Sequence, residues 1–358
     1  MLSSGHTQPG DYSIAYDLYS QMGMWDKANA MMMAGSHRFP NGLMAMQVAL
    51  SRFGSLRMVS IDSLIAGYFR FKQRFPNAFM QSASTKIQDE MLSTIASQYI
   101  DSGDYKKFMF FASQIKDPIE QANEYYFQAR ELMTSNKGLP FADSILKMSL
   151  NIVLQSIDNP GRDKHSYQTN SDWAKEMQKT YAQYADFYAM LLNKEGKMKE
   201  AVDYEKKAVN YLDDESPILN EHYVQYLLDA KDYKVAQERL ESFFINGSST
   251  DKMNTDLKPL YIRLNHSEKG YIGYLLKLEE KANIKLKTDM TNEILNEPAP
   301  RFTLPDLYNK QISMATLKGK VVVLDFWATW CGPCKLSFPG MQKVVENYKS
   351  DTNVVFLF

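Results

Sequence analysis

The chain contains two cysteines, Cys331 and Cys334, and two residues separate them in the segment DFWATWCGPCK. A thiolate is the attacking species in disulfide exchange, and a second thiol at this spacing can attack the mixed disulfide that results. A structural disulfide here would close a loop too short to remove much chain entropy. A zinc site would need a second pair of ligands beside them. The spacing therefore predicts a redox-active dithiol.

The residues around the dithiol predict a strand, a helix and a second strand. The apolar, β-prone run 321–326 suits a strand buried on both faces of a parallel sheet. A helix is expected over about 334–348, followed by a strand in NVVFLF. A thiol at a helix N-terminus lies near unpaired N–H groups and the positive end of the helix dipole, which favour the thiolate. We therefore interpret Cys331 as the exposed nucleophile and Cys334 as the more buried resolving thiol.

Three neighbouring residues fit the same interpretation. Gly332 permits a tight turn, and Pro333 suits an early helical position where no N–H is required. Asp325 lies in the apolar run, where a carboxylate is costly unless it has a partner or a task. We interpret Asp325 as a base for Cys334 during resolution. The alternative is an aspartate at the frayed end of the strand, bonded to a loop.

These residues carry a family resemblance. The segment VVVLDFWATWCGPCK resembles the active-site segment of thioredoxin-fold proteins, including the buried aspartate six residues before the first cysteine. The preceding EPAPRFTLPDLYNKQISMATLKGK is similar to TlpA/ResA-like thiol-disulfide reductases and the related AhpC/TSA redoxins. The resemblance implies a nucleophilic Cys331, a resolving Cys334 and a supporting Asp325. It also implies active-site support from Trp330, Gly332, Pro333, Lys335 and Pro339, the last matching a proline that kinks the helix in that family.

The resemblance covers residues 297–358, and the chain departs from the family in two ways. The family's cis-proline loop, last two strands and final helix would lie beyond Phe358, so we expect the N-terminal half of the fold and a fragment of a longer reductase. Peroxidase members use a Thr-x-x-Cys setting with a nearby arginine, whereas this chain has Trp-Cys-Gly-Pro-Cys. A peroxiredoxin-type peroxidase is therefore the less favoured alternative.

Residues 12–287 predict helices, because apolar residues recur at helical spacing and strand-like alternation is scarce. Short turn signals recur at Gly23, Gly103, Gly138, Gly196 and Lys231. Two of the intervals are 35 residues, close to the tetratricopeptide period. Small residues at Ala189, Ala201, Ala208 and Ala236 suit the close approach of paired helices. The region resembles tetratricopeptide repeats, most clearly over 181–244.

The predicted fold class is therefore multidomain: an all-α helical-repeat, tetratricopeptide-like domain followed by a partial α/β thioredoxin-like domain. The expected boundaries are 1–290 for the helical domain, 291–300 for a linker and 301–358 for the thioredoxin-like half-domain. Pro298, Pro300 and Pro305 prohibit a long helix across the junction.

Composition limits the partners. With 41 basic and 42 acidic residues, the formal net charge is -1, which gives no reason to expect nucleic acid. The run YFRFKQRFP, with Arg70, Lys72 and Arg74 among aromatics, is interpreted as a solvated amphipathic helix end. No apolar run is long enough for a transmembrane segment. The five histidines have no i,i+4 pair and no cysteine companion, so neither a metal site nor a cofactor is expected.

The predicted function is thiol-disulfide exchange that reduces protein disulfides, with an electron-donating dithiol protein as the second partner. The helical region either positions the redox domain or binds a peptide or protein ligand. The rival hypothesis is a helical-repeat interaction scaffold with a vestigial redox domain. The resemblance implies the bacterial cell envelope or periplasm, whereas the start of the chain shows no signal peptide and leaves the cytoplasm as the alternative.

Overall fold

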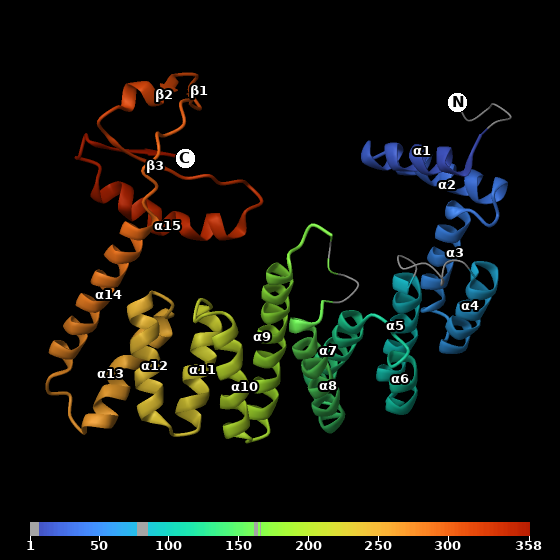
Figure 1. Cartoon of the computed structure of the whole chain (residues 1–358), viewed down its shortest axis with the longest axis horizontal. Helices are drawn as coiled ribbons and strands as arrows, with labels where there is room; N and C mark the ends of the chain where they lie inside the picture. The colour runs from blue at the N-terminus through green and yellow to red at the C-terminus, as the bar shows by residue number, and fades with distance from the viewer. Residues whose placement is uncertain (1–6, 77–84, 161–163, 165) are drawn as a thin grey trace. The chain divides into compact units, whose positions relative to one another are not determined.

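The structure is a computed structural model that describes residues 7–76, 85–160, 164 and 166–358 (Figure 1). The chain divides into two compact units, Met1–Lys287 and Thr288–Phe358. Each unit is described by itself below. Among the described residues, no helix combines the length and the apolar character needed to cross a lipid bilayer.

The first unit is a succession of helices in which each packs on the next, most extensively α7 on α8 and α9 on α10 (Figure 1). The helices are α1 Pro9–Gln21, α2 Trp25–Arg38, α3 Leu43–Leu56, α4 Ile61–Arg74, α5 Thr85–Ser102, α6 Tyr105–Ala112, α7 Pro118–Thr134, α8 Leu139–Asp158, α9 Asn170–Lys194, α10 Met198–Tyr211, α11 Pro217–Asp229, α12 Tyr233–Asn246, α13 Asp251–Asn265 and α14 Tyr271–Glu293. The predicted helical-repeat architecture is confirmed.

Every turn signal found in the sequence lies between two helices and adopts a left-handed backbone. The φ angles are +70° at Gly23, +74° at Gly103, +56° at Gly138, +77° at Gly196 and +61° at Lys231. A side chain in this conformation crowds the following carbonyl, and only glycine avoids the cost. The signal therefore marks the residue that reverses the chain between paired helices, even where lysine stands for glycine.

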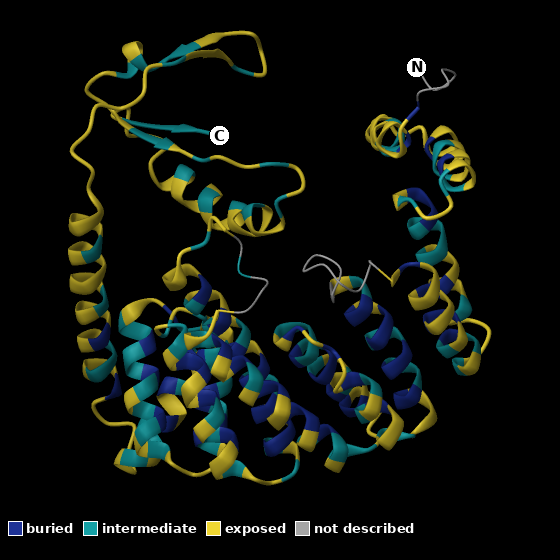
Figure 2. Cartoon of the chain, turned by 45° about the vertical axis from the view of Figure 1, so that its right-hand side comes forward, coloured by how far each residue is buried: buried dark blue, intermediate teal, exposed yellow. Residues whose placement is uncertain are grey.

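The core of this unit runs along the faces where helices meet. One cluster of buried residues extends from Ala45 on α3 to Tyr226 on α11, and a second from Val209 on α10 to Leu278 on α14. The alanines singled out in the sequence are all fully buried: Ala189, Ala201, Ala208 and Ala236. Buried residues gather on the inward sides of the central helices (Figure 2). Small side chains at these positions let neighbouring helices approach closely.

The second unit contains two small sheets and one helix. Strands β1 (Thr303–Pro305) and β2 (Gln311–Ser313) form an antiparallel hairpin, followed by the 3₁₀ helix η3 (Met314–Leu317). Strand β3 (Val321–Leu324), helix α15 (Gly332–Asn347) and strand β4 (Val354–Leu357) follow in order. β3 and β4 pair in parallel, with Val321 opposite Val354 and Leu324 opposite Leu357. The predicted β-α-β unit with the dithiol at its first turn is confirmed.

Details of this unit differ from the expectation. β3 ends at Leu324 rather than at 326, and its residues are partly or largely exposed rather than buried on both faces. In the part of the second unit that is described, β3 pairs with β4 alone and α15 is the one α-helix that lies wholly in this unit, so few residues are available to cover the sheet. α15 begins at Gly332 rather than near Cys334, and α14 continues to Glu293 within the range expected for the linker.

The turn conformation predicts two stability changes of opposite sign. Gly196→Ala should lower the free energy of unfolding by about 1 kcal/mol, because a Cβ there meets no atom within 4 Å and only the left-handed backbone penalises it. Lys231→Gly should raise the free energy of unfolding by about 0.5–1 kcal/mol, since relief of backbone strain exceeds the added entropy of the unfolded chain. Urea denaturation followed by circular dichroism measures both. Changes of the same sign would contradict this account of the turns.

Candidate functional site

The dithiol lies at the N-terminus of α15. Cys331 is the N-cap residue, and its Sγ accepts a hydrogen bond from the backbone N–H of Cys334 at 3.2 Å. The two cysteines are joined by a disulfide, with their Cα atoms 5.4 Å apart. Both side chains are partly exposed. The arrangement places Cys331 sulfur at the end of the helix where unpaired N–H groups stabilise negative charge.

The local sequence accounts for this helix start. Gly332 is the first residue of α15 and Pro333 the second, a position at which a missing N–H costs nothing. The Cys331 backbone is extended, with φ -78° and ψ 97°, as N-cap residues usually are. Its carbonyl accepts the N–H of Lys335 at 3.3 Å, which begins the helical hydrogen-bond series. The short Cys-Gly-Pro-Cys segment thus forms both the turn and the first helical turn.

The other expected support residues surround this turn. Trp330 precedes Cys331 and is 86% exposed, so its indole adds apolar surface directly beside the disulfide. Lys335 is exposed in the first turn of α15, and Pro339 lies inside the same helix. The edge-to-face contact of Trp327 with Phe338, at a centroid distance of 5.2 Å, packs the loop before the dithiol against α15.

Asp325 follows directly on β3, and its N–H donates to the carbonyl of Leu357 at 3.0 Å. Its Oδ2 is buried without a hydrogen-bond partner among the described residues. The residue borders a cavity of about 500 Å³ lined mostly by apolar side chains, including Leu324, Phe326 and Trp327. In the described part of the chain, no hydrogen bond links Asp325 to either cysteine. The structure therefore brings the two thiols together and places Asp325 at the strand end, facing an apolar cavity.

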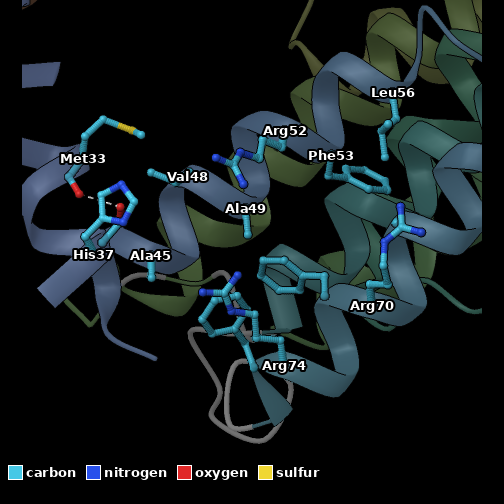
Figure 3. Close-up of a pocket in the computed structure, with 14 residues that line it drawn as sticks. Met33, His37, Ala45, Val48, Ala49, Arg52, Phe53, Leu56, Arg70 and Arg74 are labelled. Carbon is cyan, nitrogen blue, oxygen red and sulfur yellow. Dashed lines mark hydrogen bonds between the residues drawn. The ribbon is translucent and has the colours of Figure 1, made fainter. Parts of the chain in front are cut away.

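A second candidate site is a groove in the helical unit, between α2, α3 and α4 (Figure 3). Its volume is about 470 Å³, and its floor contains the buried rings of Phe53, Phe71 and Phe75. Three arginines line it: Arg52, Arg70 and Arg74. No aspartate or glutamate does so among the described lining residues. The end of α4 is amphipathic as predicted, but its arginines face a groove, which the sequence analysis did not find.

Sequence analysis also missed a group of three titratable side chains in the helical unit: Asp186, Glu205 and His222. One signal for them was present in the sequence. Glu205 stands four residues after Ala201 and three before Ala208, so it lies on the buried stripe of α10. A charged residue at a core-facing position usually has a partner or a function.

Comparison with known proteins bears on the second unit. Residues 295–357 match the AhpC/TSA family. Thiol-disulfide oxidoreductase ResA of Bacillus subtilis (strain 168) is 50% identical over 52 residues, which are 14% of this chain and 29% of ResA. Thioredoxin-like protein YneN of the same organism is 42% identical over 59 residues, 16% of this chain and 35% of YneN. The chain thus spans about a third of the length of the curated relatives that it matches. Its second unit matches the thioredoxin-like AhpC/TSA domain.

One solved structure, of Podosopora anserina kinesin light chain TPR-like repeats, is 13% identical and covers 58% of this chain and 98% of that one, with a TM-score of 0.32. The helical-repeat fold described above rests on the helices and turns of this chain themselves.

The N-cap geometry predicts which thiol reacts first. In the reduced protein at neutral pH, iodoacetamide should modify Cys331 about tenfold faster than Cys334, because the helix terminus favours the Cys331 thiolate. Peptide mapping by mass spectrometry after short labelling measures the ratio, and Cys331→Ser controls for intrinsic reactivity of Cys334. Faster labelling of Cys334 would reverse the two roles.

Proposed function

We propose that the second unit is a thiol-disulfide oxidoreductase that reduces disulfides of protein substrates. The observation that carries this proposal is the Cys331–Cys334 disulfide at the N-terminus of α15, with the Cys331 sulfur hydrogen-bonded to the Cys334 N–H. The similarity to ResA over the same segment supports it. The bacterial cell envelope is the proposed location, on the ground of the resemblance to TlpA/ResA-like reductases.

The proposed reaction has two exchange steps. The Cys331 thiolate attacks a substrate disulfide; a bond from Cys331 Sγ to one substrate sulfur forms, and the other substrate sulfur leaves as a thiolate that takes a proton. The Cys334 thiolate then attacks Cys331 Sγ and releases the second substrate thiol. The enzyme is left with the Cys331–Cys334 disulfide seen here. An electron-donating dithiol protein reduces this disulfide and completes the cycle.

Asp325 is the proposed base for the second step. Its Oδ2 is buried, lacks a hydrogen-bond partner among the described residues and lies beside a cavity lined mostly by apolar side chains. Proton transfer from the Cys334 thiol would convert that thiol to the attacking thiolate. Trp330 and Lys335 are proposed to shape the surface on which the substrate lies, since both are exposed beside the dithiol.

A trapping experiment tests the reaction. Cys334→Ser should accumulate a mixed disulfide between Cys331 and an oxidised protein such as insulin, because no thiol remains to resolve it. Cys331→Ser, the matched control, should trap none. The adduct is counted on non-reducing gels and by mass spectrometry. A scaffold with a vestigial redox domain would form no adduct and would bind its partners equally well after both cysteines are replaced.

The same assay tests whether Asp325 acts as the base in the second step. Asp325→Asn, introduced in the chain with both cysteines, should slow the release of the mixed disulfide by about a hundredfold or more, the scale of one lost acid–base group. The same change in the Cys334→Ser chain should leave the rate of adduct formation nearly unaltered. Equal slowing of both steps would remove Asp325 as the base and leave it a structural role.

For the helical unit, we propose binding of an acidic peptide segment in the groove of α2, α3 and α4. The observation that favours it is the set of three arginine side chains around an aromatic floor (Figure 3). Arg74 donates to the carbonyl of Pro40 at 2.9 Å and lies over the ring of Phe75, whereas Arg52 and Arg70 form no ion pair with any described carboxylate. Guanidinium groups pair with carboxylates at two points, and the floor accepts an apolar side chain.

Fluorescence anisotropy tests this binding. A labelled peptide with glutamates flanking one leucine should bind in the groove. Its affinity should fall as the salt concentration rises, because exposed ion pairs are screened. The double change Arg52→Gln, Arg70→Gln should raise the Kd by about tenfold or more, equal to about 1.4 kcal/mol. Arg57→Gln, on an exposed arginine outside the groove, should not change it. Equal binding of a peptide with glutamines in place of glutamates would contradict the proposal.

A further inference from the structure

Three consecutive helices of the first unit bring a carboxylate, a second carboxylate and an imidazole together. Asp186 comes from α9, Glu205 from α10 and His222 from α11, and one ligand atom from each lies within 4.8 Å of the other two. Nδ1 of His222 is 2.6 Å from Oδ1 of Asp186. These residues are far apart along the chain, so only the stacking of the helices assembles them.

Glu205 is the residue whose surroundings point to a bound ligand. Its side chain is fully buried, and as a carboxylate neither of its oxygens receives a hydrogen bond from the described residues, while Asp186 lies close enough to share a proton with it. An ionised carboxylate that is removed from water without a partner destabilises the folded state. Burial, and then the neighbouring Asp186 carboxylate, raise the pKa of Glu205 to about 9. No Lys or Arg forms an ion pair with it in the described part of the chain.

An ordinary polar contact in the core explains two of the three residues. Asp186 and His222 satisfy each other, and that hydrogen bond raises the pKa of His222. It accounts for Glu205 only as a neutral acid beside Asp186, although an apolar side chain at that position would continue the stripe formed by Ala201, Ala208 and Val209. A cation placed among the three side chains would satisfy all of them together.

We propose that Asp186, Glu205 and His222 bind one divalent transition-metal ion. The ion displaces the proton of Glu205, and the two carboxylates then balance the charge of a divalent cation. An imidazole nitrogen favours zinc and similar ions over magnesium or calcium, which prefer more oxygen ligands. Tetrahedral zinc, with bonds of about 2.0–2.1 Å, holds its ligand atoms about 3.3 Å apart. The present separations, 2.6 Å between His222 Nδ1 and Asp186 Oδ1 and up to 4.8 Å within the group, lie on either side of that value.

The proposed ion has an access route and a structural effect. The His222 side chain is 39% exposed and that of Asp186 19%, so the cluster opens to solvent on the side of the imidazole, where water can complete the coordination. A bound ion would tie α9, α10 and α11 together, the part of the chain with the clearest repeat signature. Binding to the folded state alone stabilises that state by mass action.

Zinc titration of the whole chain tests the site. The Cys331–Cys334 disulfide is kept oxidised and no histidine tag is present, so that neither thiols nor a tag can bind the ion. After treatment with a chelator, calorimetry should show one equivalent of Zn²⁺ bound, and the Tm should rise with zinc concentration. Glu205→Gln, which keeps the side-chain volume, should raise the Kd by about tenfold or more. Asp186→Asn should do the same.

A control variant and a measurement of the Tm distinguish a loss of metal binding from a loss of folding stability. Glu200→Gln, on the same helix but exposed, should leave the Kd unchanged. The metal-free Tm of Glu205→Gln should equal or exceed that of the parent, since the change removes a buried ionisable group without creating a cavity. Absence of saturable zinc binding, or an unaltered Kd in Glu205→Gln, would overturn the proposal, and the three residues would then be a polar cluster of the helix core.

Discussion

The close approach of neighbouring helices is the constraint on which the first unit depends. Ala189, Ala201 and Ala208 have no exposed surface, and side chains of this size let α9 and α10 lie against each other over their length. Paired helices at that distance must be joined by a chain reversal of a few residues, which requires the left-handed backbone at Gly196. The same packing stacks each helix pair on the next pair. A buried side chain of one helix therefore contacts the buried side chains of the neighbouring helices.

That packing also explains why charge is found in the core. Glu205 replaces an apolar residue on the buried stripe of α10, and it meets Asp186 and His222 because α9 and α11 contact the same face. In a closely packed interior bulk water does not reach such a carboxyl group, so its ionisation depends on the polar side chains of the neighbouring helices. The groove of α2, α3 and α4 has the opposite character, with three arginines at its exposed rim. The two sites differ because Glu205 is enclosed by helices, with solvent reaching its cluster only on the side of His222, whereas the arginines of the groove are exposed.

The second unit depends on a local constraint instead. Within four residues, Cys331 to Cys334, the chain ends a loop, caps a helix and joins two sulfurs. The N–H groups of the first helical turn have no partner within the helix, and the Cys331 sulfur accepts one of them. The chemistry of the thiol is therefore set by the start of α15, and the parallel pair β3–β4 determines where that start lies. This is why a short segment of sequence carries so much information about function.

Much of the fold, and the position of the dithiol, could be predicted from local sequence patterns. The continuous apolar run before the dithiol predicted β3, but the hairpin β1–β2 was not predicted, because strands of three residues are too short to show alternation. The end of β3 at Leu324 was also missed, since an apolar run does not show where hydrogen-bond pairing stops. The turns were predicted because a short turn signal recurs between the helical segments, and the structure showed that each signal has a left-handed backbone. The arginine groove was not, because its residues come from separate helices.

The sequence by itself determined the helix pairs, their turns and the position of the dithiol, since each depends on residues within a few positions of one another. The tertiary structure alone decided which side chains from different helices share a site. Asp186 and His222 are ordinary polar residues along the chain, and the place of Glu205 on the buried stripe of α10 does not show which residues it meets. Arg52, Arg70 and Arg74 are ordinary surface residues. Their proximity follows from the angles and distances at which helices pack, and those depend on the side chains at every contact at once.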